Sequence, residues 1–188
     1  MAGPKPLRIG LISYRSNPHC GGQGVYVKNL SRALADLGHR VTVISGPPAP
    51  SLNADIPLHR LPSLDLYNPE APFRIPSLRE LADPINLIEW AGVATTGFPE
   101  PFTFGLRAYR FLRRRLGDFD VIHDTQSLSY GIAMIARRVP TVATIHHPIT
   151  VDRALAIRSA HGFAKKLKSL RWHSFIGMQR RVAPHFER

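Results

Sequence analysis

The chain has 188 residues, of which 44% are hydrophobic and 20% are charged, and its formal net charge is +12 at pH 7. This composition is typical of a globular protein, and the length suffices for one substantial core. No apolar run is long enough to span a bilayer, no signal-peptide segment begins the chain, and the single cysteine, Cys20, excludes an intrachain disulfide. These features are compatible with a reducing compartment, and we expect a cytoplasmic protein.

The positive charge is concentrated in the last third of the chain. Residues 125–188 contain 11 Lys and Arg but only two Asp and Glu, whereas residues 1–124 contain 14 and 11. Such a basic segment suits an anionic lipid surface, a nucleic acid or a phosphorylated ligand. It is equally compatible with a solvated face, or with a face that another domain covers.

Short apolar runs alternate with segments of helical periodicity along the chain. Strands are expected at residues 7–13, 41–45, 58–62, 120–124 and 141–146. Helices are expected at residues 25–37, 77–82, 84–94, 102–116, 127–138, 152–160 and 164–182. This alternation predicts an α/β fold with a doubly wound, Rossmann-like parallel sheet in one domain over residues 1–188, with a basic helical segment from about residue 152.

A glycine cluster, Gly21-Gly22-Gln23-Gly24, separates the first expected strand from the first expected helix. The first turn of a helix presents free backbone N–H groups and the positive end of the helix dipole, and glycines allow an anion to approach them. The cluster therefore predicts a site for a phosphate or a diphosphate. A tight entry into the helix, with nothing bound, is the alternative.

Polar side chains follow the fourth and fifth expected strands. Asp124, Thr125 and Gln126 follow one, and His146 and His147 follow the other. Ligands of open α/β sheets bind at the carboxyl ends of the strands, where a neutral imidazole can hydrogen-bond a sugar hydroxyl or a phosphate oxygen. A packed, purely structural histidine is the alternative. The spacing of histidines and acids does not indicate a metal site.

Several segments, in this order, resemble the N-terminal domain of the family-4 retaining glycosyltransferases, which have the GT-B architecture. They are residues 21–27 (GGQGVYV), 30–34 (LSRAL), 37–43 (LGHRVTV), 120–123 (DVIH) and 144–148 (TIHHP). The resemblance covers about residues 7–150 and extends more loosely into the basic segment. It implies that this chain is the N-terminal half of a GT-B enzyme.

The resemblance also implies an activity and a set of site residues. Such an enzyme transfers a sugar from a nucleotide-sugar to an acceptor with retention, and it uses no cofactor or metal. His146 would be catalytic and contact the transferred sugar. The donor diphosphate would lie at Gly21, Gly22, Gln23 and Gly24. The acceptor side would include Tyr67, Asn68, Asp124, Thr125, Gln126 and His147.

The sequence departs from the family pattern after the basic segment. The family places an E-x7-E motif in its C-terminal donor domain, whereas Glu187 is the only glutamate after Glu100 here. We therefore expect the donor domain to be absent from this chain and to be required as a partner. The chain alone is expected to transfer little or no sugar.

Other interpretations of the chain remain open. Residues 163–176 combine cations with apolar residues, which suits either an anionic membrane surface or a helix packed on the sheet. The alternative function is that of a non-enzymatic module that binds nucleic acid or a membrane. The sequence contains no recognised nucleic-acid-binding motif, and we do not expect a nucleic acid to be a partner. A dinucleotide oxidoreductase is disfavoured because no G-x-G-x-x-G follows the first strand. A sugar-nucleotide epimerase shares the GT-B architecture but fits the strand-end pattern less well.

Overall fold

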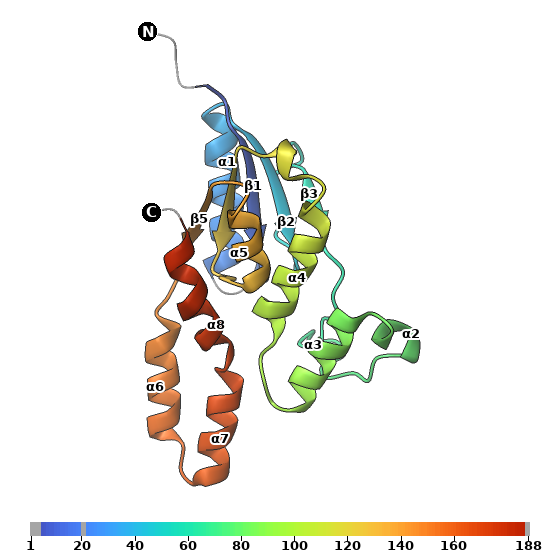
Figure 1. Cartoon of the computed structure of the whole chain (residues 1–188), viewed down its shortest axis with the longest axis vertical. Helices are drawn as coiled ribbons and strands as arrows, with labels where there is room; N and C mark the ends of the chain where they lie inside the picture. Colours follow the sequence, from blue (N-terminus) through green and yellow to red (C-terminus); the bar gives the residue numbers. More distant parts are fainter. Residues whose placement is uncertain (1–4, 20–21, 187–188) are drawn as a thin grey trace.

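The computed structural model describes residues 5–19 and 22–186, and within them it shows a five-stranded, entirely parallel sheet (Figure 1). The strand order is β3-β2-β1-β4-β5. The strands are β1 (Arg8–Ser13), β2 (Arg40–Ser45), β3 (Leu58–Arg60), β4 (Val121–Thr125) and β5 (Thr141–Thr144). The expected doubly wound fold is therefore confirmed, and all five expected strands are present.

One face of the sheet is covered by α1 (Gly22–Asp36). Leu11 of β1 lies opposite Val43 of β2 and His123 of β4 in the strand register. Leu11 and Val43 are fully buried against Val27 of α1. The helix therefore fixes its apolar stripe on the sheet and holds its N-terminus at the carboxyl edge.

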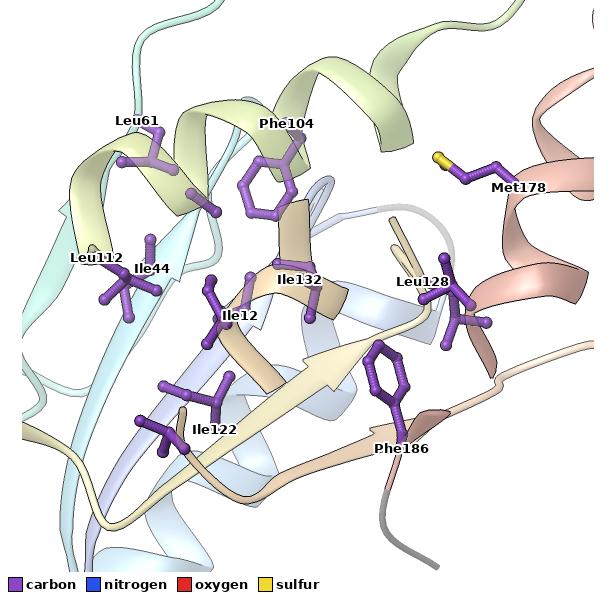
Figure 2. Packing of buried hydrophobic residues seen from close by; sticks show 14 residues of the cluster. Ile12, Ile44, Leu61, Phe104, Leu112, Ile122, Leu128, Ile132, Met178 and Phe186 are labelled. Atoms are coloured by element: carbon purple, nitrogen blue, oxygen red, sulfur yellow. The ribbon is translucent and has the colours of Figure 1, made fainter. Parts of the chain in front are cut away.

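The other face is covered by α4 (Glu100–Leu112), α5 (Tyr130–Ala136) and α8 (Phe175–Val182). Figure 2 shows the apolar side chains that these elements bury together. The labelled ones are Ile12, Ile44, Leu61, Phe104, Leu112, Ile122, Leu128, Ile132, Met178 and Phe186. Helices α4 and α5 cross closely where two glycines meet. A Cβ on Gly131 would lie 1.9 Å from the carbonyl oxygen of Gly105, so the crossing requires a glycine at position 131.

Two short helices, α2 (Leu78–Leu81) and α3 (Pro84–Ala94), follow the long loop after β3. Asp83 caps α3 through the Ile85 N–H, and Pro84 occupies the first helical turn, as expected. A buried ion pair between Glu89 of α3 and Arg107 of α4 joins the two helices. Thr103 adds a hydrogen bond of 3.0 Å to the same carboxylate, which satisfies a charge that would be costly to bury alone.

Helices α6 (Ile149–Ser159) and α7 (Phe163–Trp172) form a hairpin that projects from the sheet (Figure 1). Neither helix contains a buried residue. The expected single helix over residues 164–182 is wrong, because the chain turns at residues 173–174 before α8 begins. There the imidazole Nδ1 of His173 lies 2.8 Å from the Ser169 carbonyl oxygen, at the end of α7.

Several other expected boundaries differ from those observed, and three of them bear on the site or on the packing of α4. Helix α4 ends at Leu112, because Arg115 folds back over the Phe111 ring and donates to the Phe111 carbonyl at 2.9 Å. Strand β4 continues to Thr125, so Asp124 lies inside the strand. Strand β5 ends at Thr144, so His146 and His147 lie in the following loop. Two 3-10 turns, Leu116–Asp118 and Ala183–His185, complete the described elements.

Candidate functional site

The candidate site lies at the carboxyl edge of the sheet, where β1, β4 and β5 end beside the N-terminus of α1. Gln23 joins these elements: its side-chain amide donates to the Thr125 carbonyl at 2.7 Å and lies 3.2 Å from the Ser13 hydroxyl. Thr125 in turn donates its hydroxyl to the Ile12 carbonyl at 2.9 Å. Gln23 therefore anchors the helix over β1 and β4.

The glycines of the loop differ in their surroundings. Gly21 lies outside the described residues, as does Cys20. Gly24 is buried, and a Cβ there would lie 2.2 Å from the Asn17 carbonyl oxygen, so the loop after β1 requires this glycine. Gly22 has open space around it and begins α1. Of the described glycines in this loop, Gly22 is the one placed to let an anion reach the helix N-terminus.

A cluster of polar rings lies on the same side of the sheet as α1. The Thr144 hydroxyl is 2.8 Å from His123 Nε2 and 3.0 Å from the Tyr26 hydroxyl. The Tyr26 ring meets the His146 ring edge to face, with 4.7 Å between the centroids. The side chains that surround His146 are therefore linked to one another through Tyr26, His123 and Thr144. These three residues were not among the site residues predicted from the sequence. The available signal was their position along the chain: Thr144 ends β5, His123 lies in the middle of β4, and Tyr26 lies in the first turns of α1.

The side chain of His146 is a neutral imidazole at pH 7, because its pKa is lowered. Burial lowers its pKa below the ordinary 6.5, and the neighbouring His147 lowers it further. The pKa of His123 is also lowered, first by burial and then by His146. The Nε2 atom of His146 is buried and forms no hydrogen bond with any residue that the structure describes. An unpaired buried nitrogen is costly. Because the His146 residue as a whole is only half-buried, a small rotation of its ring would bring this atom to a polar ligand at the surface.

Gln126 fixes the loop that carries both histidines. Its side-chain oxygen accepts from the His146 N–H at 2.9 Å, and its amide donates to the His147 carbonyl at 3.1 Å. The backbone of Gln126 has a φ of +64° and its carbonyl accepts from Gln179 of α8 at 2.9 Å. Since only 4% of Gln126 is exposed, we describe it as a residue that positions the site.

Asp124 lies on the opposite face of the sheet from His123 and is completely buried. Its carboxylate accepts from the Leu128 N–H at 2.7 Å and from the Ser127 hydroxyl. Burial raises the pKa of Asp124 to about 6. The structure therefore gives Asp124 a role in holding the turn before α5, because no part of its side chain is open to an acceptor.

Tyr67 and Asn68 are in the loop after β3, in different surroundings. The Tyr67 hydroxyl donates to the Gly97 carbonyl at 2.9 Å, and its ring packs against Phe98 and Trp172. The Asn68 amide lies 3.3 Å from the Asp65 carboxylate. In the described part of the chain no hydrogen bond or ring contact joins these two residues to His146. His147 is exposed on the β5–α6 loop, 3.5 Å from Asp152.

An ion pair near this edge was also missed by sequence reasoning. Arg15, in the loop after β1, donates to both carboxylate oxygens of Glu100 at 3.0 Å. Glu100 is at the start of α4, and burial raises its pKa to about 7 despite the opposing effect of Arg15. The pair ties the loop after β1 to α4, 85 residues away in sequence.

Two negative findings apply to the described residues, 5–19 and 22–186. Among them, no three His, Cys, Asp or Glu side chains are grouped so that they could bind a metal ion. No helix within those ranges has both the length and the apolar character needed to cross a membrane.

A parallel sheet with helices on both faces, and with an imidazole cluster beside a helix N-terminus at its carboxyl edge, defines an α/β ligand-binding domain. The model of Glycosyltransferase Family 4 matches residues 20–188. The chain therefore belongs to Glycosyltransferase Family 4, as the sequence motifs indicated.

Two relatives agree with this assignment. The MMP alpha-(1->4)-mannosyltransferase of Mycolicibacterium hassiacum is 53% identical over 179 residues, which are 94% of this chain and 43% of that protein. The D-inositol 3-phosphate glycosyltransferase of Kribbella flavida is 33% identical over 162 residues, which are 80% of this chain and 34% of that protein. The chain thus spans less than half the length of these relatives.

Among solved structures, the glycosyltransferase SsfS6 of Streptomyces sp. SF2575 aligns with 92% of this chain and 46% of its own. The sequence identity is 17% and the TM-score is 0.39.

Proposed function

We propose that this chain is the acceptor-side domain of a retaining, GT-B glycosyltransferase that uses a nucleotide-sugar donor. The observation that carries the proposal is the buried, unpaired Nε2 of His146 at the carboxyl edge, near the open N-terminus of α1. The imidazole of His146 can hydrogen-bond a sugar hydroxyl, and the N–H groups at the N-terminus of α1 can bind a diphosphate. Membership of Glycosyltransferase Family 4 supports the same activity.

The proposed chemistry is electrostatic. The neutral His146 imidazole exchanges a hydrogen bond with a hydroxyl of the transferred sugar, and Gln126 holds its backbone in place. The N–H groups at Gly22 and the α1 dipole stabilise the negative charge that develops on the leaving diphosphate. This scheme needs no cofactor or metal from the protein. The acceptor lies on the His147 side, where the β5–α6 loop is exposed.

The similarity to the mycobacterial relative favours mannose as the transferred sugar, because that relative is named a mannosyltransferase. A second domain of the GT-B type completes the donor site in this proposal. We place the enzyme in the cytoplasm.

The test is transfer of labelled sugar from a panel of nucleotide-sugars, including an activated mannose. The chain is assayed alone and together with the part of the Mycolicibacterium hassiacum relative that lies outside the matched segment, expressed separately. We expect turnover only in the mixture, and loss of that turnover with His146→Ala. Full activity of the chain alone would contradict the need for a partner domain. A mixture that is inactive, although the two parts form a complex, would contradict the proposed activity.

A second proposal concerns an anionic membrane surface. Residues 163–176 were expected either to lie on an anionic membrane surface or to pack on the sheet. In α7, Phe163 is 83% exposed and Leu167 is 54% exposed. A hollow lies between α7 and α6, and its lining includes Lys165, Lys168 and Trp172 of α7 and Ala156 of α6. Phe163 and Leu167 are thus exposed, whereas Trp172 packs against Tyr67 and Phe98. Cations flank the two exposed residues, as in helices that lie on membranes.

Cosedimentation with vesicles tests this second proposal. We expect binding to vesicles that contain phosphatidylglycerol, weakened by salt, and little binding to phosphatidylcholine alone. Leu167→Glu should remove the binding without loss of thermal stability, whereas Leu37→Glu, at another exposed apolar position, should leave it intact. Binding that ignores lipid charge would contradict the proposal.

A further inference from the structure

A groove of about 510 Å³ separates α3 and α4 from α7 and α8. Its volume is within the range of small-molecule sites. The walls are mainly apolar and aromatic, and they include Phe98, Phe102, Phe175 and Met178. Phe98 and Phe175 meet edge to face with 5.4 Å between their centroids, so the α3–α4 loop and α8 fix this wall together. The groove is not used by the proposed transfer of sugar.

One charged side chain lines the groove. The Arg171 guanidinium donates to the Thr95 hydroxyl at 2.8 Å and to the Ser174 hydroxyl at 3.2 Å. Within residues 5–19 and 22–186, no carboxylate forms an ion pair with Arg171, and no acidic residue lines the groove. A guanidinium has five N–H donors, so Arg171 retains donors for a ligand as well as its full charge.

The hydroxyl contacts hold this cation against the groove. Thr95 ends α3 and Ser174 precedes α8, and the guanidinium lies next to Gly97, where a Cβ would be 3.2 Å from it. A larger residue at position 97 would press on the Arg171 side chain. The cation is therefore fixed between the α3–α4 loop and the start of α8, with the apolar walls beside it.

We propose that this groove binds a free single-chain amphiphile with a terminal carboxylate, of the fatty-acid class. The aliphatic chain lies between Phe98, Phe102 and Met178, where burial of its methylene groups supplies most of the affinity. The carboxylate pairs with Arg171, a cation that has no acidic partner among the residues that the structure describes. This ligand class matches both features of the groove, an apolar body and one positive charge.

Isothermal titration calorimetry of the full chain with decanoate, below the concentration at which decanoate aggregates, tests the proposal. We expect saturable binding at one site. Arg171→Gln should weaken decanoate binding at least tenfold, the effect expected for a hydrogen-bonded charge pair, and should leave binding of the neutral 1-decanol unchanged. Lys168→Gln is the matched control on the same helix, since Lys168 lies beside α6 and not in the groove.

A second pair of variants tests the groove itself. Ala91→Trp places a large side chain in the groove and should abolish binding of both ligands, whereas Ala94→Trp, also exposed on α3 but outside the lining, should have no effect. Thermal unfolding confirms that each variant is folded, and Arg171→Lys, which keeps the charge, should retain decanoate binding. The proposal is overturned if decanoate does not bind saturably, or if Lys168→Gln weakens it as much as Arg171→Gln. No nucleotide-sugar is present, so the result is independent of the proposed transferase activity.

Discussion

The backbone N–H of His146 donates to the side-chain oxygen of Gln126 at 2.9 Å, so a residue that leaves β4 fixes a residue that follows β5. Gln126→Leu would leave the His146 N–H and the His147 carbonyl without this partner. We expect a loss of about 1–3 kcal/mol in the free energy of unfolding, measured with urea. Asn29→Leu, at an exposed position on α1, is the control and should change stability by less than about 0.5 kcal/mol. Equal effects of the two changes would contradict the bridging role.

His146 itself should matter for activity more than for stability. Its Nε2 has no partner among the described residues, so His146→Ala removes no side-chain hydrogen bond and mainly loses the edge-to-face contact with Tyr26. In the assay with the partner domain, we expect kcat to fall at least tenfold while the melting temperature changes by only a few degrees. His161→Ala, at an exposed position between α6 and α7, is the control and should leave kcat unchanged. A larger fall in kcat with His147→Ala than with His146→Ala would show that His147, and not His146, makes the catalytic contact.

The pH dependence of transfer gives a separate check on His146. Its pKa is lowered from the ordinary 6.5, so the folded protein keeps a neutral imidazole at pH 7. Transfer that depends on neutral His146 should stay constant from pH 8 to 7 and fall only as the pH is lowered below 6.5. Initial rates measured across that range decide this. A rate that rises as the pH is lowered would indicate that the charged imidazolium is the active form.

Most strands could be predicted from sequence because they contain a short run of apolar and β-branched residues that ends at a turn signal, although β3 has a single apolar residue, Leu58. The contacts of the site could not, because they join residues far apart in the chain. Tyr26 and Thr144, for example, are 118 positions apart, and the hydrogen bond between them requires both α1 and β5 to be in place. The periodicity of α1 shows which face is apolar, but not that its first turns reach the end of β5. Asp124, Thr125 and Gln126 were expected on the acceptor side because of the family resemblance and their polar side chains, whereas three-dimensional packing buries all three.

The two described glycines of the loop give a matched pair of variants. A methyl group at position 24 would lie 2.2 Å from the Asn17 carbonyl oxygen, while one at position 22 would meet open space. We expect Gly24→Ala to destabilise the chain by about 1–3 kcal/mol, because the loop backbone has to move, and Gly22→Ala to be nearly neutral. Urea unfolding of both variants tests this.

Gly22→Ala also separates stability from donor binding. Its methyl group would crowd an anion at the N-terminus of α1, so KM for the nucleotide-sugar should rise while the free energy of unfolding is unchanged. If KM stays at the wild-type value, the donor diphosphate does not approach Gly22.

The buried carboxyl of Glu100 should make the protein less stable as the pH rises. Its pKa is raised to about 7 from the ordinary 4.5, mainly by burial, so between these values the folded state holds the proton more tightly than the unfolded state. The stability due to this proton is therefore complete below pH 4.5 and is lost as the pH rises through 7. The shift corresponds to a loss on the order of 3 kcal/mol.

Glu100→Gln keeps the shape of the side chain and removes its titration. The difference in the free energy of unfolding between this variant and the wild type should therefore move in favour of the variant as the pH rises from 4.5 to 8. Taking the difference cancels the titration of Asp124, whose raised pKa acts in the same direction, and of His123 and His146, whose lowered pKa values act in the opposite one. Glu70→Gln, on an exposed loop, controls for the change in net charge. A difference that does not vary with pH would show that Arg15 keeps Glu100 ionised in the folded protein throughout this range.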